Sequence, residues 1–303
     1  MSVDLSVQVG SLRLSNPVLT ASGTFGYALE YDDFFDVTEL GGICTKGLSL
    51  LPRPGNRPDR IAETAAGMLN AIGLANVGVE AFCTEKLPIL RARGVTVIAN
   101  VFATTVEDFV ALARRIDREE GVAAVELNVS CPNVDKGGLE FGVDPAAAAR
   151  VTEAVRKATR LPVWVKMSPE AGDLRGVGLA CQEAGADALT AINTIRGLAI
   201  DVRTWRPRIA NKTGGLSGPA LKPIAIRMVW ELARAVKIPV IGIGGIATAE
   251  DAAEFMLAGA TAVQVGTASF ADPLAAKKVK DGLARYCEER GIAARELIGK
   301  MIT

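Results

Sequence analysis

The stretch Glu183-Ala-Gly-Ala-Asp-Ala-Leu189 returns in nearly the same form as Leu257-Ala-Gly-Ala-Thr-Ala-Val263. In each copy, the residues before the glycine continue a helical pattern, and those after it begin an apolar run. Glycine is favoured just beyond the end of a helix because it adopts the left-handed conformation without strain. Two such joints predict repeated helix-to-strand units, which are typical of parallel α/β proteins.

Short apolar runs recur on both sides of these joints and alternate with helical patterns, so we expect parallel strands joined by crossover helices. The predicted strands are Pro17–Thr20, Gly42–Thr45, Thr96–Val101, Ala124–Val129, Pro162–Met167, Ala188–Asn193, Pro239–Ile243 and Ala262–Val265. The predicted helices include Val106–Arg118, Asp144–Ala158, Leu221–Val236 and Ala249–Leu257, with N-terminal caps at Asp144, which precedes a proline, and at Thr248. Eight such units predict an α/β fold, the (β/α)8 TIM barrel.

Two further features complete the predicted architecture. Val7–Val9 and Leu12–Leu14 flank Gly10-Ser11 and predict a small N-terminal β-hairpin at the bottom of the barrel. The connections Gly47–Val79, Ser130–Asp144 and Thr194–Pro219 are long and follow strands, so we expect long loops on the C-terminal, catalytic face. Because no linker or low-complexity segment interrupts the chain, residues 1–303 are predicted to form a single domain.

The composition narrows the class of protein. With 34 basic and 34 acidic residues the formal charge is zero, which does not favour nucleic-acid binding. The N-terminus carries no basic segment followed by an apolar run, and nothing approaches the roughly 20 apolar residues of a membrane span, so we expect a cytoplasmic protein without a membrane partner. Histidine is absent, which removes the usual zinc ligand and the usual general base, and no metal site is expected.

Glycines after the last two predicted strands indicate a phosphate site. Ile241-Gly-Ile-Gly-Gly-Ile246 and Val265-Gly-Thr267 stand where barrels bind phosphate through backbone N–H groups and a helix N-terminus. The simpler interpretation is that these glycines only permit tight turns. We favour phosphate binding because both loops carry the signal at the expected place.

Polar side chains at the ends of apolar strands are the second signal. A strand buried on both faces does not place lysine or asparagine there without a partner. Such residues end or interrupt five strands, namely Lys46, Asn100, Asn128, Lys166 and Asn193. Their convergence on one mouth favours a planar polar ligand with many donors and acceptors, such as a flavin with a carboxylated pyrimidine.

Cys131 is the best-placed base candidate. The five cysteines are odd in number and scattered, which fits reduced thiols, and a lone cysteine is more often a small buried hydrophobe than a catalyst. Cys44, Cys83, Cys181 and Cys287 lie in strand or helix patterns and keep that interpretation. Cys131 instead follows the fourth strand and begins a loop on the catalytic face, where its thiolate can accept a proton near neutral pH.

Four motifs together resemble one enzyme family: Asn128-Val-Ser-Cys-Pro-Asn133, Asn70-Ala-Ile-Gly-Leu-Ala-Asn76, Thr45-Lys46-Gly47 and Gly215-Leu-Ser-Gly-Pro-Ala220. They look like the class 1 dihydroorotate dehydrogenases, and the match runs nearly end to end. Asn193-Thr-Ile-Arg-Gly-Leu-Ala-Ile-Asp201 and Asn211-Lys-Thr-Gly-Gly-Leu-Ser-Gly218 resemble the NAD-linked class 1B catalytic subunit more than the fumarate-using class 1A enzyme. Class 2 enzymes use serine as base and carry a membrane-associating extension, so Cys131 argues against them.

The resemblance implies one FMN per chain and oxidation of dihydroorotate to orotate in pyrimidine biosynthesis. Cys131 would remove the C5 proton and FMN would accept the C6 hydride. The FMN contacts it implies are Ser22, Lys46, Gly47, Asn100, Asn128, Lys166, Ile192, Gly218, Gly244, Gly245, Gly266 and Thr267. The substrate contacts it implies are Lys46, Asn70, Ile72, Gly73, Leu74, Asn128, Asn133, Asn193 and Thr194.

The resemblance also implies partners. NAD would receive the electrons through a second subunit that carries FAD and a 2Fe-2S cluster, because the scattered cysteines of this chain do not suit a cluster. A homodimer at the core of a heterotetramer is expected.

Three alternatives stay open at this stage. The chain could be a class 1A enzyme or a related FMN-barrel dihydropyrimidine oxidoreductase, which electron-acceptor assays would separate. It could be a flavin-free phosphate-binding barrel acting as a lyase or isomerase, in which case the purified protein would be colourless. A non-enzymatic binding role would leave the ring of strand-end polar residues without a purpose.

Overall fold

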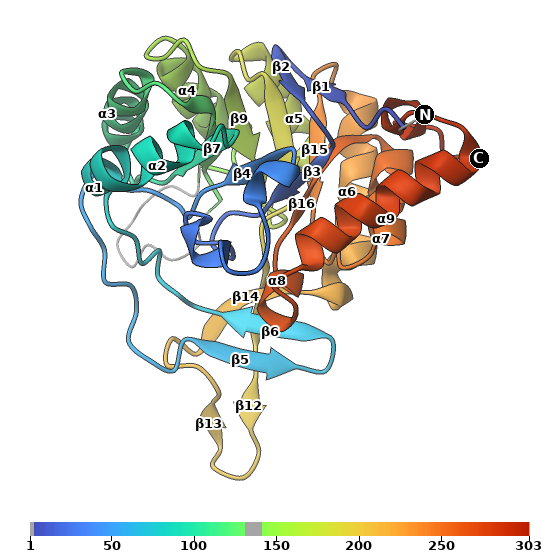
Figure 1. The fold of residues 1–303 in the computed structure, drawn as a ribbon. Helices are drawn as coiled ribbons and strands as arrows, with labels where there is room; N and C mark the ends of the chain where they lie inside the picture. The colour runs from blue at the N-terminus through green and yellow to red at the C-terminus, as the bar shows by residue number, and fades with distance from the viewer. Residues whose placement is uncertain (1–2, 131–140, 303) are drawn as a thin grey trace.

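The computed structural model describes residues 3–130 and 141–302, and its centre is a closed parallel barrel (Figure 1). Within the described chain, eight strands follow one another around the barrel in chain order, and the last pairs with the first. The barrel strands are β3 (Val18–Thr20), β4 (Gly42–Cys44), β7 (Val97–Val101), β8 (Val122–Asn128), β9 (Val163–Lys166), β10 (Ala188–Ala191), β15 (Val240–Ile243) and β16 (Ala260–Val265). The predicted barrel is confirmed, and each predicted strand coincides with one of these to within two residues at either end.

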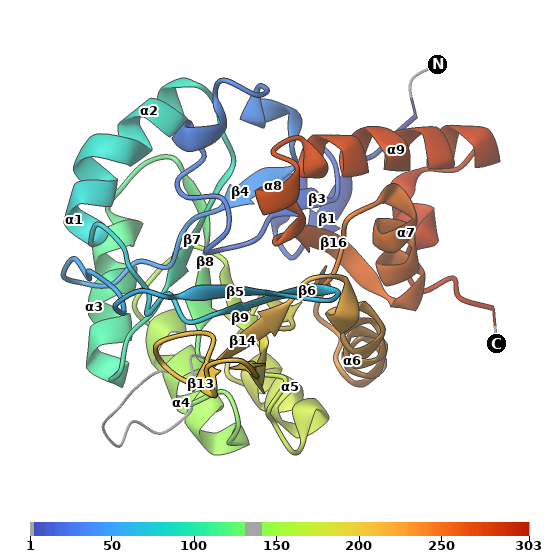
Figure 2. The ribbon, with the colours of Figure 1, turned by 90° about the horizontal axis from the view of Figure 1, so that it is seen from below.

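Helices surround the barrel and cover its outer face (Figure 2). They are α1 (Val79–Ala81), the π-helical turn η3 (Phe82–Lys86), α2 (Leu87–Ala92), α3 (Val106–Asp117), α4 (Pro145–Arg156), α5 (Leu174–Glu183), α6 (Lys222–Ala235), α7 (Ala249–Ala258), α8 (Ala268–Ala271) and α9 (Ala275–Arg290). The 3-10 turns are η1 (Leu29–Tyr31), η2 (Val37–Glu39), η4 (Pro219–Leu221) and η5 (Ala294–Leu297).

Both predicted helix caps are confirmed. The Asp144 carboxylate accepts from the backbone N–H groups of Ala146 and Ala147 at 3.2 and 3.1 Å, which fixes the start of α4. Thr248 forms a capping box with Asp251 at the start of α7. These caps satisfy N–H groups that a helix leaves without partners in its first turn, so the helix begins where the sequence indicates.

The predicted N-terminal hairpin is present as β1 (Val7–Val9) paired antiparallel with β2 (Leu12–Leu14). Val7, Val9 and Leu14 are buried. A Cβ added at Gly10, in the turn, would lie 3.3 Å from the backbone oxygen of Asp187, which immediately precedes β10. The hairpin therefore packs at the N-terminal end of the barrel, opposite the mouth, as expected.

Two of the predicted long loops contain strands that the sequence did not reveal. β5 (Ile61–Thr64) and β6 (Gly67–Asn70) come from the first, and β11 (Ile195–Leu198) and β14 (Thr213–Ser217) from the second. They form an antiparallel sheet in the order β11-β14-β6-β5, which lies beneath the barrel in Figure 1 and crosses its end in Figure 2. We call this sheet the cap. Because the connections that build it leave the C-terminal ends of barrel strands, it covers the mouth.

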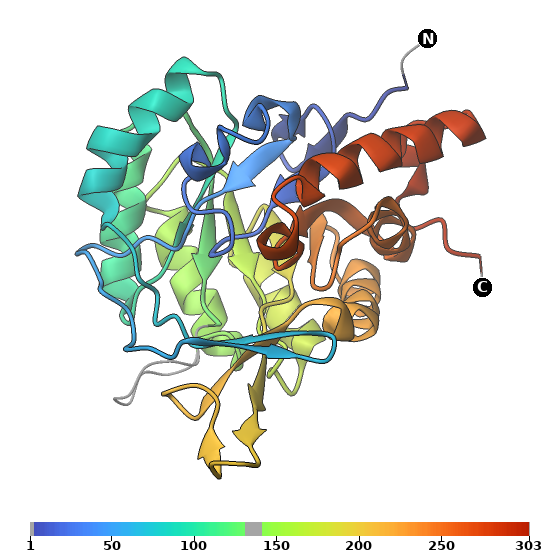
Figure 3. The same cartoon turned by 60° about the horizontal axis from the view of Figure 1, so that its bottom comes forward.

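The hairpin of β12 (Ile200–Asp201) and β13 (Arg206–Pro207) projects from the cap away from the barrel (Figure 3). Trp205 at its end is 88% exposed and Val202 is 80% exposed. This hairpin contrasts with the barrel, whose strand residues are almost all buried.

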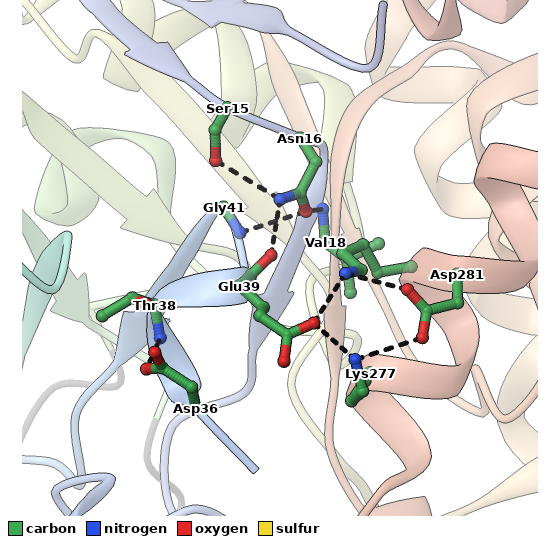
Figure 4. A network of polar contacts seen from close by, with 10 residues as sticks. Ser15, Asn16, Val18, Asp36, Thr38, Glu39, Gly41, Lys277 and Asp281 are labelled. Carbon is green, nitrogen blue, oxygen red and sulfur yellow. Dashed lines mark hydrogen bonds and ion pairs between the residues drawn. The ribbon is translucent and has the colours of Figure 1, made fainter. Parts of the chain in front are cut away.

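The last long helix is tied to the segment that follows the first barrel strand (Figure 4). The Glu39 carboxylate lies between Lys277 and Lys280 of α9, and Lys280 also contacts Asp281 at 2.8 Å. The backbone oxygen of Glu39 accepts from Asn16 Nδ2 at 3.0 Å. Residues from both ends of the chain thus meet where β3 and β16 close the barrel.

Candidate active site

The floor of the mouth is a row of polar side chains at the carboxyl ends of neighbouring strands. Asn128 and Thr190 are the register neighbours of Lys166, so all three side chains lie on the same face of the sheet. Lys166 is only 4% exposed, and its Nζ donates to Ser22 Oγ at 2.9 Å. Because β3 and β9 stand on opposite sides of the barrel, this bond spans the mouth and places the ammonium group inside it.

Asn193, which follows β10, is brought next to Asn128 of this row. Asn193 Nδ2 donates to Asn128 Oδ1 at 3.3 Å and to Ser130 Oγ at 2.7 Å. Ile192, the residue before Asn193, is buried, and the backbone N–H of Thr194 donates to Asn193 Oδ1 at 2.8 Å. These bonds hold the two asparagines in fixed orientations, as a site for a polar ring requires.

A carboxylate that the sequence reasoning missed lies deeper in the barrel. Glu126 is fully buried on β8, two residues before Asn128 and therefore on the same face of the strand. It accepts from Asn100 Nδ2 at 2.7 Å, Thr190 Oγ1 at 2.8 Å, Gln264 Nε2 at 2.8 Å and Cys44 Sγ at 3.2 Å. The sequence does contain a signal for Glu126, because it is a charged residue within an otherwise apolar strand.

Three glycines lie close together at the C-terminal end of β15, where the phosphate site is predicted. We call them the glycine cradle. Gly218, Gly244 and Gly245 have φ values of 100°, 136° and 77°, which favour glycine. A Cβ at Gly245 would lie 2.8 Å from the backbone oxygen of Gly218. Beside them, Thr267 Oγ1 donates to Ser217 Oγ at 2.8 Å. Bare backbone at two adjoining loops lets an anion approach the N–H groups.

Gly266 and Gly47 are also tightly packed against their neighbours. A Cβ at Gly266 would lie 3.2 Å from Ala21 Cβ, and one at Gly47 would lie 2.9 Å from Asn100 Oδ1. The neighbouring Lys46 is half-buried. Burial, and secondarily the positive charge of Arg60, lowers the pKa of the Lys46 ammonium. An anionic ligand at this position would offset both effects.

The cap supplies the remaining predicted residues. Asn70 ends β6 and donates through Nδ2 to the backbone oxygen of Gly215 at 3.3 Å. A Cβ at Gly215 would lie 2.0 Å from Thr194 Oγ1, so Thr194 packs against the same strand. Ile72, Gly73 and Leu74 follow β6 and are half-buried, the last two with φ of 74° and 57°. The cap thus brings Asn70 and Thr194, distant in sequence, to one side of the mouth.

Comparison with known proteins gives a family for this arrangement. The family model described as dihydroorotate dehydrogenase matches residues 4–286. The chain belongs to the dihydroorotate dehydrogenase family. It is 56% identical over 301 residues to a protein of Geotalea uraniireducens (strain Rf4), with 99% of each chain covered. It is 57% identical over 299 residues to a protein of Geobacter sulfurreducens, with 98% of each covered. Both are named "Dihydroorotate dehydrogenase B (NAD(+)), catalytic subunit", which confirms the resemblance to the NAD-linked type.

Two predicted site residues of this family member lie outside the described residues, namely Cys131 and Asn133. The other four cysteines are buried and unpaired. Burial is the main reason that the pKa of each of these thiols is raised, to about 11 for Cys83 and Cys181. A thiol with a raised pKa is a poor base precursor at neutral pH, so these four fit the structural interpretation.

Within residues 3–130 and 141–302, no cluster of three or more potential metal ligands occurs. Across the same ranges, no helix combines the length and the apolar character needed to cross a bilayer.

Proposed function

We propose that this member of the dihydroorotate dehydrogenase family oxidises (S)-dihydroorotate to orotate in pyrimidine biosynthesis, with one FMN per chain. The observation that carries the proposal is the pairing of a glycine cradle with a ring of buried polar side chains at one barrel mouth. A cradle alone would suit any phosphorylated ligand. The polar ring beside it suits a flavin and a pyrimidine stacked above the floor.

The residues present fit FMN. Gly218, Gly244 and Gly245 let the two loops pack closely, because a Cβ at each would collide with neighbouring protein atoms, and the backbone N–H groups of these loops would hold the phosphate. Lys166, held by Ser22 across the mouth, would face the ring system with its positive charge. When bound, FMN supplies the acceptor for the C6 hydride. A buried ammonium beside a ring that gains electrons stabilises the product of that step.

The substrate would be oriented by Asn70, Asn128, Asn193 and Thr194. Their donors and acceptors match the carbonyl and N–H groups of a pyrimidine ring, and Lys46 would meet its carboxylate. Cys131 is proposed to accept the proton from C5 as a thiolate. An ordinary thiol has a pKa of about 8.5, so activity should rise toward alkaline pH.

Electrons are proposed to leave through a partner subunit that carries FAD and a 2Fe-2S cluster, with NAD as the final acceptor. The names of the relatives support a separate partner, because those proteins are called catalytic subunits. The scattered spacing of the cysteines along the sequence supports placing the cluster on that partner, because a cluster needs thiolates at close spacings. We further propose a cytoplasmic heterotetramer built on a homodimer of this chain.

The first experiment is the absorption spectrum of the purified chain, followed by acceptor assays. We expect a yellow protein whose flavin is bleached by dihydroorotate, which reduces artificial acceptors alone and NAD only after the partner is added. Protein that stays colourless with added FMN would favour the phosphate-binding lyase or isomerase. NAD reduction by the chain alone would reject the partner, and fumarate turnover at a comparable rate would indicate class 1A.

A further inference from the structure

The four bonds to Glu126 come from four other barrel strands and fix the direction of the side chains that donate them. Cys44, Asn100, Thr190 and Gln264 belong to β4, β7, β10 and β16. All four are 1% exposed or less, so water does not compete for the carboxylate. Asn100 is the one of these four that is also predicted to contact FMN. Its amide nitrogen points at Glu126, and its oxygen must therefore point the other way.

This arrangement leaves the side-chain oxygen of Asn100 without an acceptor bond to the part of the protein that the structure describes. Asn100 Oδ1 is buried and has no hydrogen-bond partner among the described residues. It faces Gly47 at the start of the loop that leaves β4, since a Cβ there would lie 2.9 Å from it. A buried acceptor without a partner is destabilising, so this oxygen is expected to have a ligand that donates to it.

We propose that Glu126 is a positioning residue that holds the acceptor end of Asn100 toward the flavin ring. The inference rests on the proposed function, because it takes the ligand at the mouth to be FMN. The isoalloxazine of oxidised flavin has a single ring N–H, on its pyrimidine portion, and its carbonyl oxygens and unsubstituted ring nitrogens accept. A fixed acceptor matches that N–H, whereas a flipped Asn100 would present a donor in its place.

The competing interpretation is that Glu126 only ties strands together inside the barrel. Variants that move the carboxylate from position 126 to position 100, and the amide from position 100 to position 126, distinguish the two interpretations. In Asn100→Asp, two buried carboxyl groups face each other; they share a proton at neutral pH and repel each other only once that proton is lost. Adding Glu126→Gln restores a donor at position 126, whose amide can bond the new carboxylate at position 100 while its oxygen accepts from Thr190 and Gln264. The second oxygen of that new carboxylate then faces the mouth, as the Asn100 oxygen does in the native chain.

The experiment titrates FMN into four apoproteins and follows the loss of FMN fluorescence. They are the native chain, N100D, E126Q and N100D/E126Q, each assayed from about pH 6 to about pH 9.5, because a buried carboxyl pair holds its shared proton well above the ordinary carboxyl range. E126Q serves as the matched control, since its amide oxygen can still accept from Asn100 while its nitrogen turns to Thr190 and Gln264. We expect N100D to lose FMN affinity by about tenfold or more as the pH rises through this range and the shared proton is lost, and the other two variants to stay within about threefold of native throughout.

Thermal unfolding of the same apoproteins distinguishes a positioning role of Glu126 from a role that only ties strands together. Positioning is supported if FMN affinity recovers in the double variant. It is overturned if, at the upper end of the pH range, N100D/E126Q binds no better than N100D, N100D binds like the native chain, or E126Q is as weak as N100D. Recovery of the melting temperature without recovery of affinity also overturns it. Failure of the native chain to bind FMN would instead reject the proposed function, independently of the variants.

Discussion

Removing the carboxylate of Asp251 should destabilise the loop that follows the glycine cradle. Asp251 accepts from the backbone N–H groups of Ala247 and Thr248 at 2.8 and 2.9 Å. It also pairs with Lys222 of α6 at 2.7 Å, with 12% of its side chain exposed. Burial acts to raise the pKa of Asp251, but the Lys222 ammonium and the two N–H groups outweigh it and the pKa is lowered.

The magnitude follows from what Asp251→Ala removes. The two N–H groups belong to exposed residues that water can partly solvate, so each bond is worth about 1 kcal/mol. The partly buried pair with Lys222 adds about 0.5 kcal/mol. We expect a loss of about 2.5 kcal/mol at neutral pH, or roughly 5 °C in melting temperature. Because the folded pKa is depressed, this contribution is present above about pH 4 and disappears as the pH falls through the folded value.

The matched control is Glu254→Gln, which removes the other acidic partner of the same lysine. Glu254 contacts Lys222 at 3.1 Å but is 50% exposed, so the cost should stay within about 0.5 kcal/mol. Urea unfolding at pH 7 and about pH 3 measures both variants. Equal losses for D251A and E254Q, or a D251A loss that persists undiminished at the lower pH, would refute the reasoning.

Three further outcomes are expected. Cys131→Ser should still bind FMN and orotate but lose most flavin reduction, because a hydroxyl is a much weaker acid than a thiol; rapid mixing with dihydroorotate measures this, and near-native bleaching would exclude the base role. Gly245→Ala should weaken FMN binding at least tenfold, since its Cβ would lie 2.8 Å from Gly218 O at a φ of 77°, and a fluorescence titration yielding native affinity would contradict it. Glu39→Gln should cost about 0.5–1 kcal/mol in urea unfolding at pH 7. Hydrogen bonding from Lys277 lowers the pKa of Glu39, so that cost should vanish in acid, and a pH-independent cost would speak against it.

The barrel could be predicted because strands buried on both faces appear as continuous apolar runs, which few other structures produce. The strand-end residues followed from the same pattern, since Lys166 and Asn128 interrupt it. Glu126 interrupts it as well, and its spacing of two from Asn128 would have placed it on the same face. It was overlooked because a buried carboxylate becomes understandable only when its four donors, from distant strands, are known.

The cap could not be predicted for a different reason. β14 has the sequence Thr-Gly-Gly-Leu-Ser, which carries little strand preference of its own. It becomes a strand by pairing with β6, where Gly215 opposes Asn70. A single sequence shows local preference and not such distant pairing, so these segments resemble loops. The side of the mouth formed by Asn70 and Thr194 was therefore reached only through the family resemblance.

The pairing of β16 with β3 constrains how the molecule is made. Val263 lies opposite Val18, so the strand that completes the barrel is synthesised after the other seven. Until then, a nascent chain that has already paired its first seven strands has two unpaired edges and an uncovered apolar interior, a state prone to aggregation. The ion pairs between Glu39 and α9 form after that, once α9 has been synthesised and has packed beside these strands. The barrel can therefore close only after residues 260–265 have been synthesised.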